Sequence, residues 1–224
     1  MAPITEVVIL RIAESAGSLE GTGDGASVWK ELIQTIIAQD GVQRLYWGIG
    51  VEDQTILRLF IVWESLEHHK KFQASEAHGP FIKTSLSIFS FLLVAHTELS
   101  PLAKDVFGSP AAELLTAWFP TEYTSTQQEI VESNVHKMLK AVDGKAKGSR
   151  GAVTGWGVEN DVKNLKRPGV TGKVFFLFVG WDTVEDHLAF RGSDLYKENI
   201  HFFRDAEDMQ DFLPMHSHLK EVSR

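Results

Sequence analysis

The 224-residue chain contains no cysteine. Disulfide bonds, thiolate nucleophiles and thiolate metal ligands are therefore excluded, and the reducing cytoplasm is the expected compartment. Basic residues are scarce relative to acidic ones, with 22 Lys and Arg against 30 Asp and Glu and a formal net charge of −8. This balance disfavours a nucleic acid or an anionic membrane as the partner. We expect a small hydrophobic or aromatic ligand instead.

Long apolar runs and nucleotide-binding motifs are missing as well. No run of apolar residues reaches the roughly 18 that a membrane span needs. The glycine-rich stretch from Gly21 to Gly25 lacks the lysine of a phosphate-binding loop, so we interpret it as a flexible loop. No Gly-x-Gly-x-x-Gly, Gly-x-Ser-x-Gly or flavin-binding pattern occurs. We therefore expect no membrane partner and no cofactor.

The chain does contain an internal repeat. The segment Trp63 to Phe72 matches Trp181 to Phe190, 118 residues later, with four identical positions. Glu6 and Glu113 occupy matching places near the start of each copy. Proline and glycine residues between 101 and 110 mark the boundary between the copies. We predict a first repeat over residues 1–100, a linker over 101–110 and a second repeat over 111–224.

Each repeat follows the order strand, helix, strand, strand, helix, strand. Apolar runs predict the strands, and apolar residues at 3.6-residue spacing predict the helices. In the first repeat the predicted strands are 6–12, 44–51, 56–63 and 91–99, with helices around 28–37 and from 65 onward. In the second repeat they are 114–119, 152–158, 174–181 and 212–219, with helices around 128–142 and 183–190. The fold class is α+β, with two ferredoxin-like (split βαβ) repeats.

Both faces of each predicted sheet are apolar. On the third strand of the first repeat, one face carries Leu57 and Trp63 and the other carries Phe60 and Val62. The helices can cover only one face, and the other would expose apolar surface unless a second sheet packs on it. We therefore predict an intramolecular dimeric α/β barrel, a pseudo-dimer that could itself form a homodimer. Two independent ferredoxin-like domains are the alternative.

These motifs resemble the dimeric α/β-barrel superfamily. In the first repeat, Tyr46-Trp47-Gly48, Trp63-Glu64-Ser65 and Ala77-His78-Gly79-Pro80-Phe81 are similar to stress-responsive A/B barrel proteins, which include the plant olivetolic acid cyclase. In the second repeat, the segment from Ser193 to Asn199 is similar to antibiotic-biosynthesis monooxygenase domains. Because this superfamily includes cyclases, cofactor-free oxygenases, haem proteins and proteins without known activity, the resemblance indicates the fold more than the reaction.

The resemblance implies a ligand pocket between the sheet and helices of the first repeat, with His78 as the general base. A neutral imidazole can remove an acidic C–H proton and return it. His96 and Glu6 fall at other pocket positions of the cyclase and complete the catalytic set, although a solvated strand-end Glu6 is an alternative. The cyclase has a tyrosine where this chain has Phe72, so the hydroxyl that would polarise the substrate carbonyl is missing. The residues expected to contact substrate are Leu57, Trp63, Phe72 and Trp29.

In the second repeat, Tyr196 takes the position of His78, and His216 matches His96. With Trp118 they form either an oxygenase-like substrate site or a degenerate pocket.

The remaining histidines suggest other roles. His68, His69 and His187 lie in helices rich in charged residues, so we interpret them as helix-surface groups. His216 and His218 share a strand face and could bind a metal with a third ligand, but the spacing matches no established metal motif. We expect no metal.

The expected function is a cofactor-independent enzyme of specialised metabolism that acts by general acid/base catalysis on an aromatic or polyketide-like substrate. Cyclisation, C–C bond cleavage and decarboxylation are the reactions that this chemistry favours. A cofactor-free monooxygenase and a non-catalytic, stress-responsive ligand-binding barrel are the alternatives.

Overall fold

The computed structural model describes residues 3–100 and 103–222. The chain divides into two compact units. The first unit contains the residues up to Glu98 together with those from Lys220 onward, and the second unit spans Leu99–Leu219. No helix in the described ranges is long and apolar enough to cross a membrane.

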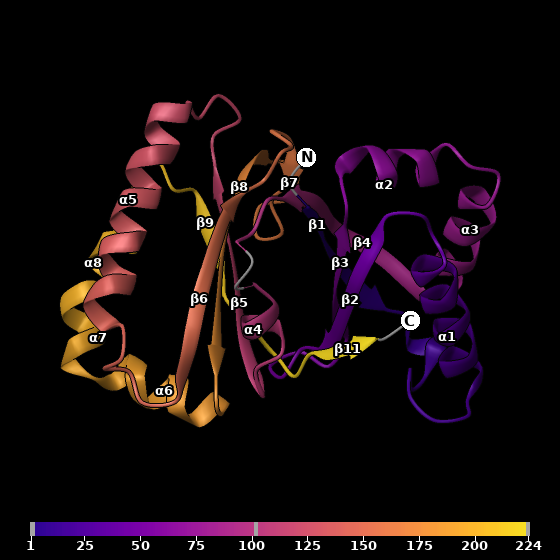
Figure 1. Ribbon diagram of the computed structural model, residues 1–224, viewed down its shortest axis with the longest axis horizontal. Helices are drawn as coiled ribbons and strands as arrows, with labels where there is room; N and C mark the ends of the chain where they lie inside the picture. The colour runs from indigo at the N-terminus through magenta and orange to yellow at the C-terminus, as the bar shows by residue number, and fades with distance from the viewer. Residues whose placement is uncertain (1–2, 101–102, 223–224) are drawn as a thin grey trace. The chain divides into compact units, whose positions relative to one another are not determined.

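The first unit is a five-stranded antiparallel sheet with its helices on one face (Figure 1). The strand order is β11-β2-β3-β1-β4, and β1 and β3 lie in the middle, as in a ferredoxin-like unit. Its elements are β1 (Ile4–Ile12), the short 3-10 helix η1 (Glu14–Ala16), α1 (Asp24–Ile37), β2 (Val42–Ile49), β3 (Ile56–Trp63), α2 (Leu66–Gln73), α3 (His78–Ile88), β4 (Phe89–Thr97) and β11 (Lys220–Val222).

The second unit repeats this topology, with the strand order β10-β5-β8-β6. Two short strands lie off this path, since β9 also pairs with β5, and β7 pairs with β8. Its elements are α4 (Ala103–Phe107), β5 (Ala111–Phe119), α5 (Ser125–Val142), β6 (Ser149–Trp156), β7 (Val162–Lys163), β8 (Thr171–Trp181), α6 (Val184–Gly192), α7 (Asp194–Asn199), α8 (His201–Arg204), β9 (Asp211–Leu213) and β10 (His216–Ser217).

Local sequence explains where the long helices form and which side they bury. In α1, Trp29, Leu32 and Ile36 recur at helical spacing and are buried against the first sheet. Helix α5 begins with a capping box, in which the Thr124 side chain accepts from the Gln127 backbone and the Gln127 side chain accepts from the Thr124 backbone. Each helix therefore presents one apolar face to its own sheet.

The predicted α+β fold of two ferredoxin-like units is confirmed. One predicted strand, 212–219, is divided into β9 and β10, because Pro214 between them has no backbone N–H to donate to the ladder. Beyond β10 the chain leaves the second unit and pairs as β11 with β2 of the first sheet. The described part of the predicted linker 101–110 forms α4, which packs on β6 and β8.

The predicted barrel can be tested in solution. Side chains alternate along a strand, so Phe60 and Val62 on β3 point away from α1, α2 and α3. Phe176 and Phe178 on β8 likewise lie on the face opposite α5, and on that face Phe178 contacts Phe107 of α4 at 5.7 Å between ring centroids. We expect these apolar faces to cover each other. A compact chain of this length has a radius of gyration of about 17 Å, which small-angle X-ray scattering should give. A clearly larger radius would indicate independent domains and contradict the barrel.

Candidate active sites

Strand register gathers three functional side chains on the helix-covered face of the first sheet. The pairing of β1 with β4 places Glu6 directly opposite His96. The pairing of β1 with β3 places Glu6 opposite Ile61, so Trp63 is a diagonal neighbour on the same face. The Trp63 Nε1–H donates a hydrogen bond of 2.9 Å to Glu6 Oε2. An acid, an imidazole and an indole therefore meet at one place on the sheet.

A second imidazole reaches this place from helix α2. His69 and Phe72 are buried at helical spacing, so this face of α2 turns toward the sheet. The His69 ring stacks on Trp63, with ring centroids 4.9 Å apart. Its Nδ1 lies 2.7 Å from Nε2 of His96, and its Nε2 lies 3.6 Å from Glu6 Oε2. Glu6, His69 and His96 are all buried, and we call them the first Glu–His–His chain.

The second unit contains the same arrangement. Glu113 on β5 pairs opposite His216 on β10. His187 of α6 stacks on Trp181 with centroids 4.9 Å apart, its Nδ1 lies 2.6 Å from Nε2 of His216, and its Nε2 lies 3.2 Å from Glu113 Oε2. These residues form the second Glu–His–His chain. The indoles differ, because the buried Trp181 Nε1–H has no hydrogen-bond partner in the described part of the chain, whereas Trp63 donates to Glu6.

The contacts restrict where the protons of each chain can lie. A neutral imidazole has one N–H donor and one acceptor nitrogen. If His187 Nε2–H donates to Glu113, its Nδ1 must accept, and the donor to it is then Nε2–H of His216. In the first unit the 3.6 Å between His69 Nε2 and Glu6 Oε2 is too long for a hydrogen bond, so the contacts assign a tautomer only in the second unit. Each carboxylate thus faces one histidine, and a second histidine orients the first.

The first Glu–His–His chain lies at a cavity of about 500 Å³ between the sheet and the helices of its unit. Glu6 and His69 line it, and His78 and Phe72 contribute to the same wall. Most of the remaining lining is apolar and includes Val8, Leu10, Trp29, Leu32, Ile36, Leu59, Ile61, Trp63, Phe81 and Phe89. The arrangement is a mainly apolar pocket with a small number of placed polar groups, as is usual for sites that bind small organic ligands.

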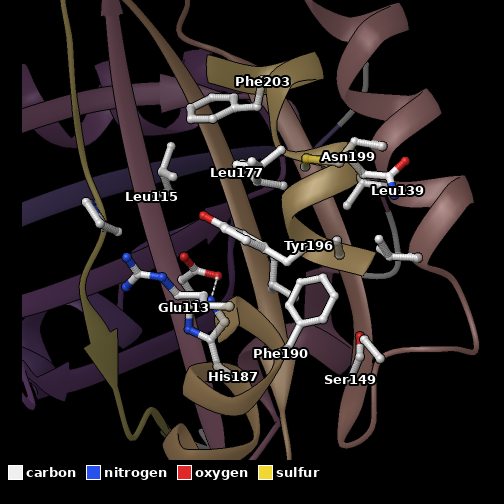
Figure 2. A pocket seen from close by; sticks show the side chains of 18 of the residues that line it. Glu113, Leu115, Leu139, Ser149, Leu177, His187, Phe190, Tyr196, Asn199 and Phe203 are labelled. Carbon is white, nitrogen blue, oxygen red and sulfur yellow. Dashed lines mark ion pairs between the residues drawn. The ribbon is translucent and has the colours of Figure 1, made fainter. Parts of the chain in front are cut away.

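The second cavity, of about 400 Å³, has the same position in the second unit. Glu113, His187 and Tyr196 line it together with apolar groups such as Leu177 and Phe203. Figure 2 shows the Tyr196 ring reaching into the cavity, with its hydroxyl directed to the side on which Glu113 lies.

Several residues predicted from the sequence lie in these cavities. Glu6, Trp63, Phe72, Trp29 and His78 line the first, and Tyr196 lines the second. His78 contacts Phe72 edge to face at 5.3 Å and 89°, and Tyr196 contacts Phe190 edge to face at 5.4 Å and 83°. The two polar residues therefore occupy equivalent positions, as the repeat indicates.

Four predicted residues do not line a cavity. His96 and His216 lie behind His69 and His187, so their expected direct contact with substrate is replaced by a supporting position. Leu57 lies farther along β3, fully buried in the core. Trp118 faces the other side of β5, because alternation separates it from Glu113, and its indole donates to the Lys163 carbonyl at 3.0 Å.

The interpretation of His69 and His187 as helix-surface groups is wrong. They are 5 % and 3 % exposed. Glu6 is 7 % exposed, so a solvated carboxylate is excluded too. Two signals in the sequence could have identified these histidines: they are identical between the repeats, and each lies three residues before a matched phenylalanine on the same helix face.

The first chain also brings together possible metal ligands. Donor atoms of Glu6, His69 and His96 lie within 4.8 Å of one another. However, nitrogens bound to one tetrahedral zinc at about 2.0–2.1 Å lie about 3.3 Å apart. The 2.7 Å between His69 Nδ1 and His96 Nε2 is instead a hydrogen-bond distance. His216 and His218 were the other possible metal ligands in the sequence. His218 Nδ1 lies 2.7 Å from the Pro110 carbonyl oxygen.

Metal content provides a test of this assignment. After incubation with equimolar zinc chloride and desalting, the full chain should retain well below one equivalent, because metal binding would have to break the His69–His96 contact. Elemental analysis measures the content, and the melting temperature should not change with EDTA. Retention of one zinc per chain that a His69→Asn substitution abolishes would contradict the hydrogen-bonded assignment.

A family model described as antibiotic biosynthesis monooxygenase matches residues 22–84. This segment lies in the first unit, whereas the sequence motifs had suggested that family for the second. No curated protein sequence matches the chain significantly.

Solved structures share the fold over nearly the whole chain. An anthrone oxidase-like protein is 15% identical, with 99% of this chain and 94% of that chain covered and a TM-score of 0.68. A protein assigned as a monooxygenase from Lactobacillus acidophilus NCFM is 13% identical, with 100% and 97% covered and a TM-score of 0.57. A mutant chlorite dismutase from Candidatus Nitrospira defluvii in complex with cyanide is 11% identical, with 97% and 90% covered and a TM-score of 0.55. At these identities the likeness shows the fold.

Proposed function

We propose that the protein is a cofactor-independent oxygenase that removes a proton from an activated carbon of an aromatic or polyketide-like ketone. The observation that carries this proposal is a carboxylate at the polar side of a mainly apolar cavity, beside two histidines, in both units; Glu6 is buried and Glu113 is largely buried. The neighbours named as a monooxygenase and as anthrone oxidase-like support oxygen as the second reactant.

The carboxylate is the group that takes the proton. Both ring nitrogens of His187 face hydrogen-bonding partners in the assigned tautomer, whereas a carboxylate has about four acceptor positions. Glu113, and Glu6 in the first unit, line the cavities and can therefore meet an acidic C–H of the substrate while they face their histidines. This assignment retains Glu6 of the predicted catalytic set and makes His78 a lining residue.

The chemistry after proton removal needs only oxygen. A CH₂ group between aromatic rings and opposite a ketone loses one proton to the carboxylate, and the resulting carbanion transfers electrons to O₂. The peroxide formed on that carbon loses water, so that one CH₂ and one O₂ give one C=O and one H₂O. The apolar wall keeps bulk water away from the carbanion, which strengthens the electrostatic effect of nearby groups. Cyclisation or C–C cleavage would use the same base without consuming oxygen.

Substitution of the two carboxylates tests the base. With anthrone as the probe, the Glu6→Gln/Glu113→Gln variant should lower kcat by about 10² to 10⁴, because glutamine keeps the shape but is not basic. Anthraquinone absorbance and an oxygen electrode measure turnover, with one O₂ expected per product, and the single variants identify the active cavity. His78→Ala is the comparison. Unchanged turnover in the double variant with loss in His78→Ala would overturn the carboxylate assignment, and product formation without oxygen uptake would overturn oxygenation.

The rear histidines are positioning residues, and a different readout tests them. Changing His96 and His216 to Asn replaces the ring nitrogens that contact His69 and His187 with a shorter amide side chain. The pH at half-maximal kcat should move, because the histidine beside each carboxylate can then change its tautomer. His68→Asn, on the same helix as His69, is the control and should keep the profile. A uniform loss of activity at every pH without movement of the midpoint would indicate a purely structural role.

A further inference from the structure

The linings of the two cavities correspond residue by residue. Trp63 and Trp181 are 118 residues apart, and the same spacing continues through the helices that follow. Residues paired by this spacing line the two cavities, one member of each pair in each cavity. Corresponding pairs in addition to the indoles are His69 and His187, Phe72 and Phe190, His78 and Tyr196, Ile82 and Ile200, and Ser85 and Phe203. Differences between the cavities can therefore be assigned to particular positions.

At two further corresponding positions, a neutral residue of the first cavity is replaced by a cationic residue in the second. Gln73 in the first cavity corresponds to Arg191 in the second, and Leu86 corresponds to Arg204. Lys140 of α5 adds a third cation to the second cavity, whose described lining also contains the acids Glu113 and Asp143. The described lining of the first cavity contains Glu6 and no Lys or Arg.

The three cations are available to a ligand. None of Lys140, Arg191 and Arg204 takes part in an ion pair with another described residue, and all three are exposed. Arg191 lies in the last turn of α6, and Arg204 ends α8, where its guanidinium lies 5.9 Å from the Phe212 ring of the same lining. They therefore form a cationic rim, which we define as Lys140, Arg191 and Arg204.

Donors farther inside complete the polar side of this cavity. The Trp181 Nε1–H is buried without a hydrogen-bond partner among the described residues, and the Tyr196 hydroxyl is directed into the cavity. The Tyr196 hydroxyl can donate to a carbonyl or phenol oxygen, whereas the Trp181 Nε1–H is covered by protein atoms. The first cavity has His78 in place of Tyr196, and its Trp63 donor is taken by Glu6.

We propose that the second cavity binds an aromatic carboxylate, with the carboxylate on the cationic rim and the ring against Phe190 and Leu177. This orientation directs the far end of the ligand to Tyr196 and Glu113. The first cavity takes an uncharged aromatic ligand. This proposal gives a ligand class for the second cavity. It rests on the proposed function only in treating that ligand as a substrate.

Calorimetric titration of the full chain, in buffer without oxygen, tests the proposal. The probes are 2-naphthoate and its uncharged analogue 2-acetonaphthone. The variant Arg191→Gln/Arg204→Leu carries the residues of the first cavity, and Gln73→Arg/Leu86→Arg is the matched reciprocal variant. The first variant should weaken naphthoate binding about tenfold, the loss expected for two exposed ion pairs, and leave 2-acetonaphthone binding unchanged. The reciprocal variant should strengthen naphthoate binding, and added salt should weaken it.

Equal naphthoate affinity in the wild type and the Arg191→Gln/Arg204→Leu variant would overturn the proposal, as would an equal loss of naphthoate and 2-acetonaphthone affinity in that variant. All substituted side chains are at the rim or in the lining, and melting temperatures identify any variant that fails to fold. In that case the single variants Arg191→Gln and Arg204→Leu decide the question. Because binding is measured without turnover, its result is independent of the Glu6 and Glu113 test of catalysis.

Discussion

The contact of a carboxylate with a histidine pair, with the acid buried in the first unit and largely buried in the second, is the interaction on which each site depends. Moving a charged carboxylate out of water costs several kcal/mol unless partners compensate it. In the second unit, Glu113 receives that compensation from His187, which His216 orients in turn. In the first, the Trp63 indole supplies a hydrogen bond in addition to the nearby His69. Removal of one partner alone leaves the others buried and unsatisfied, so these residues act as a unit.

The positions of these side chains follow from rigid elements rather than loops. The acid and the rear histidine are cross-strand neighbours on β1 and β4, or on β5 and β10, and the middle histidine comes from the first turns of α2 or α6. Side chains supported by regular elements keep their geometry better than side chains on loops. This explains how the two units keep nearly the same imidazole–imidazole distance, 2.7 Å in the first and 2.6 Å in the second.

The two units differ in the helices that follow α2 and α6 and line the rest of each cavity. A single helix α3 carries His78 and Leu86, whereas the short helices α7 and α8 carry Tyr196 and Arg204. The carboxylate that we propose as the base is therefore the same in both cavities, and the groups around the rest of the cavity differ. Such a division allows one scaffold to hold two sites with the same proton-transfer group and different preferences for ligand charge.

The sequence by itself determined the repeat, the α+β class, most strands, and the equivalence of His78 with Tyr196 and of His96 with His216. These features follow from the periodicity of apolar residues and from comparison of the two halves of the sequence, and both can be read without a structure. Only the tertiary structure decided that His69 and His187 face the carboxylates, that Trp118 lies on the opposite face, and that the C-terminal residues join the first sheet as β11. Periodicity shows that a helix face is buried, but the partner of a side chain depends on residues far away in the sequence. A histidine on a charged helix therefore gives no local sign of the acid it meets.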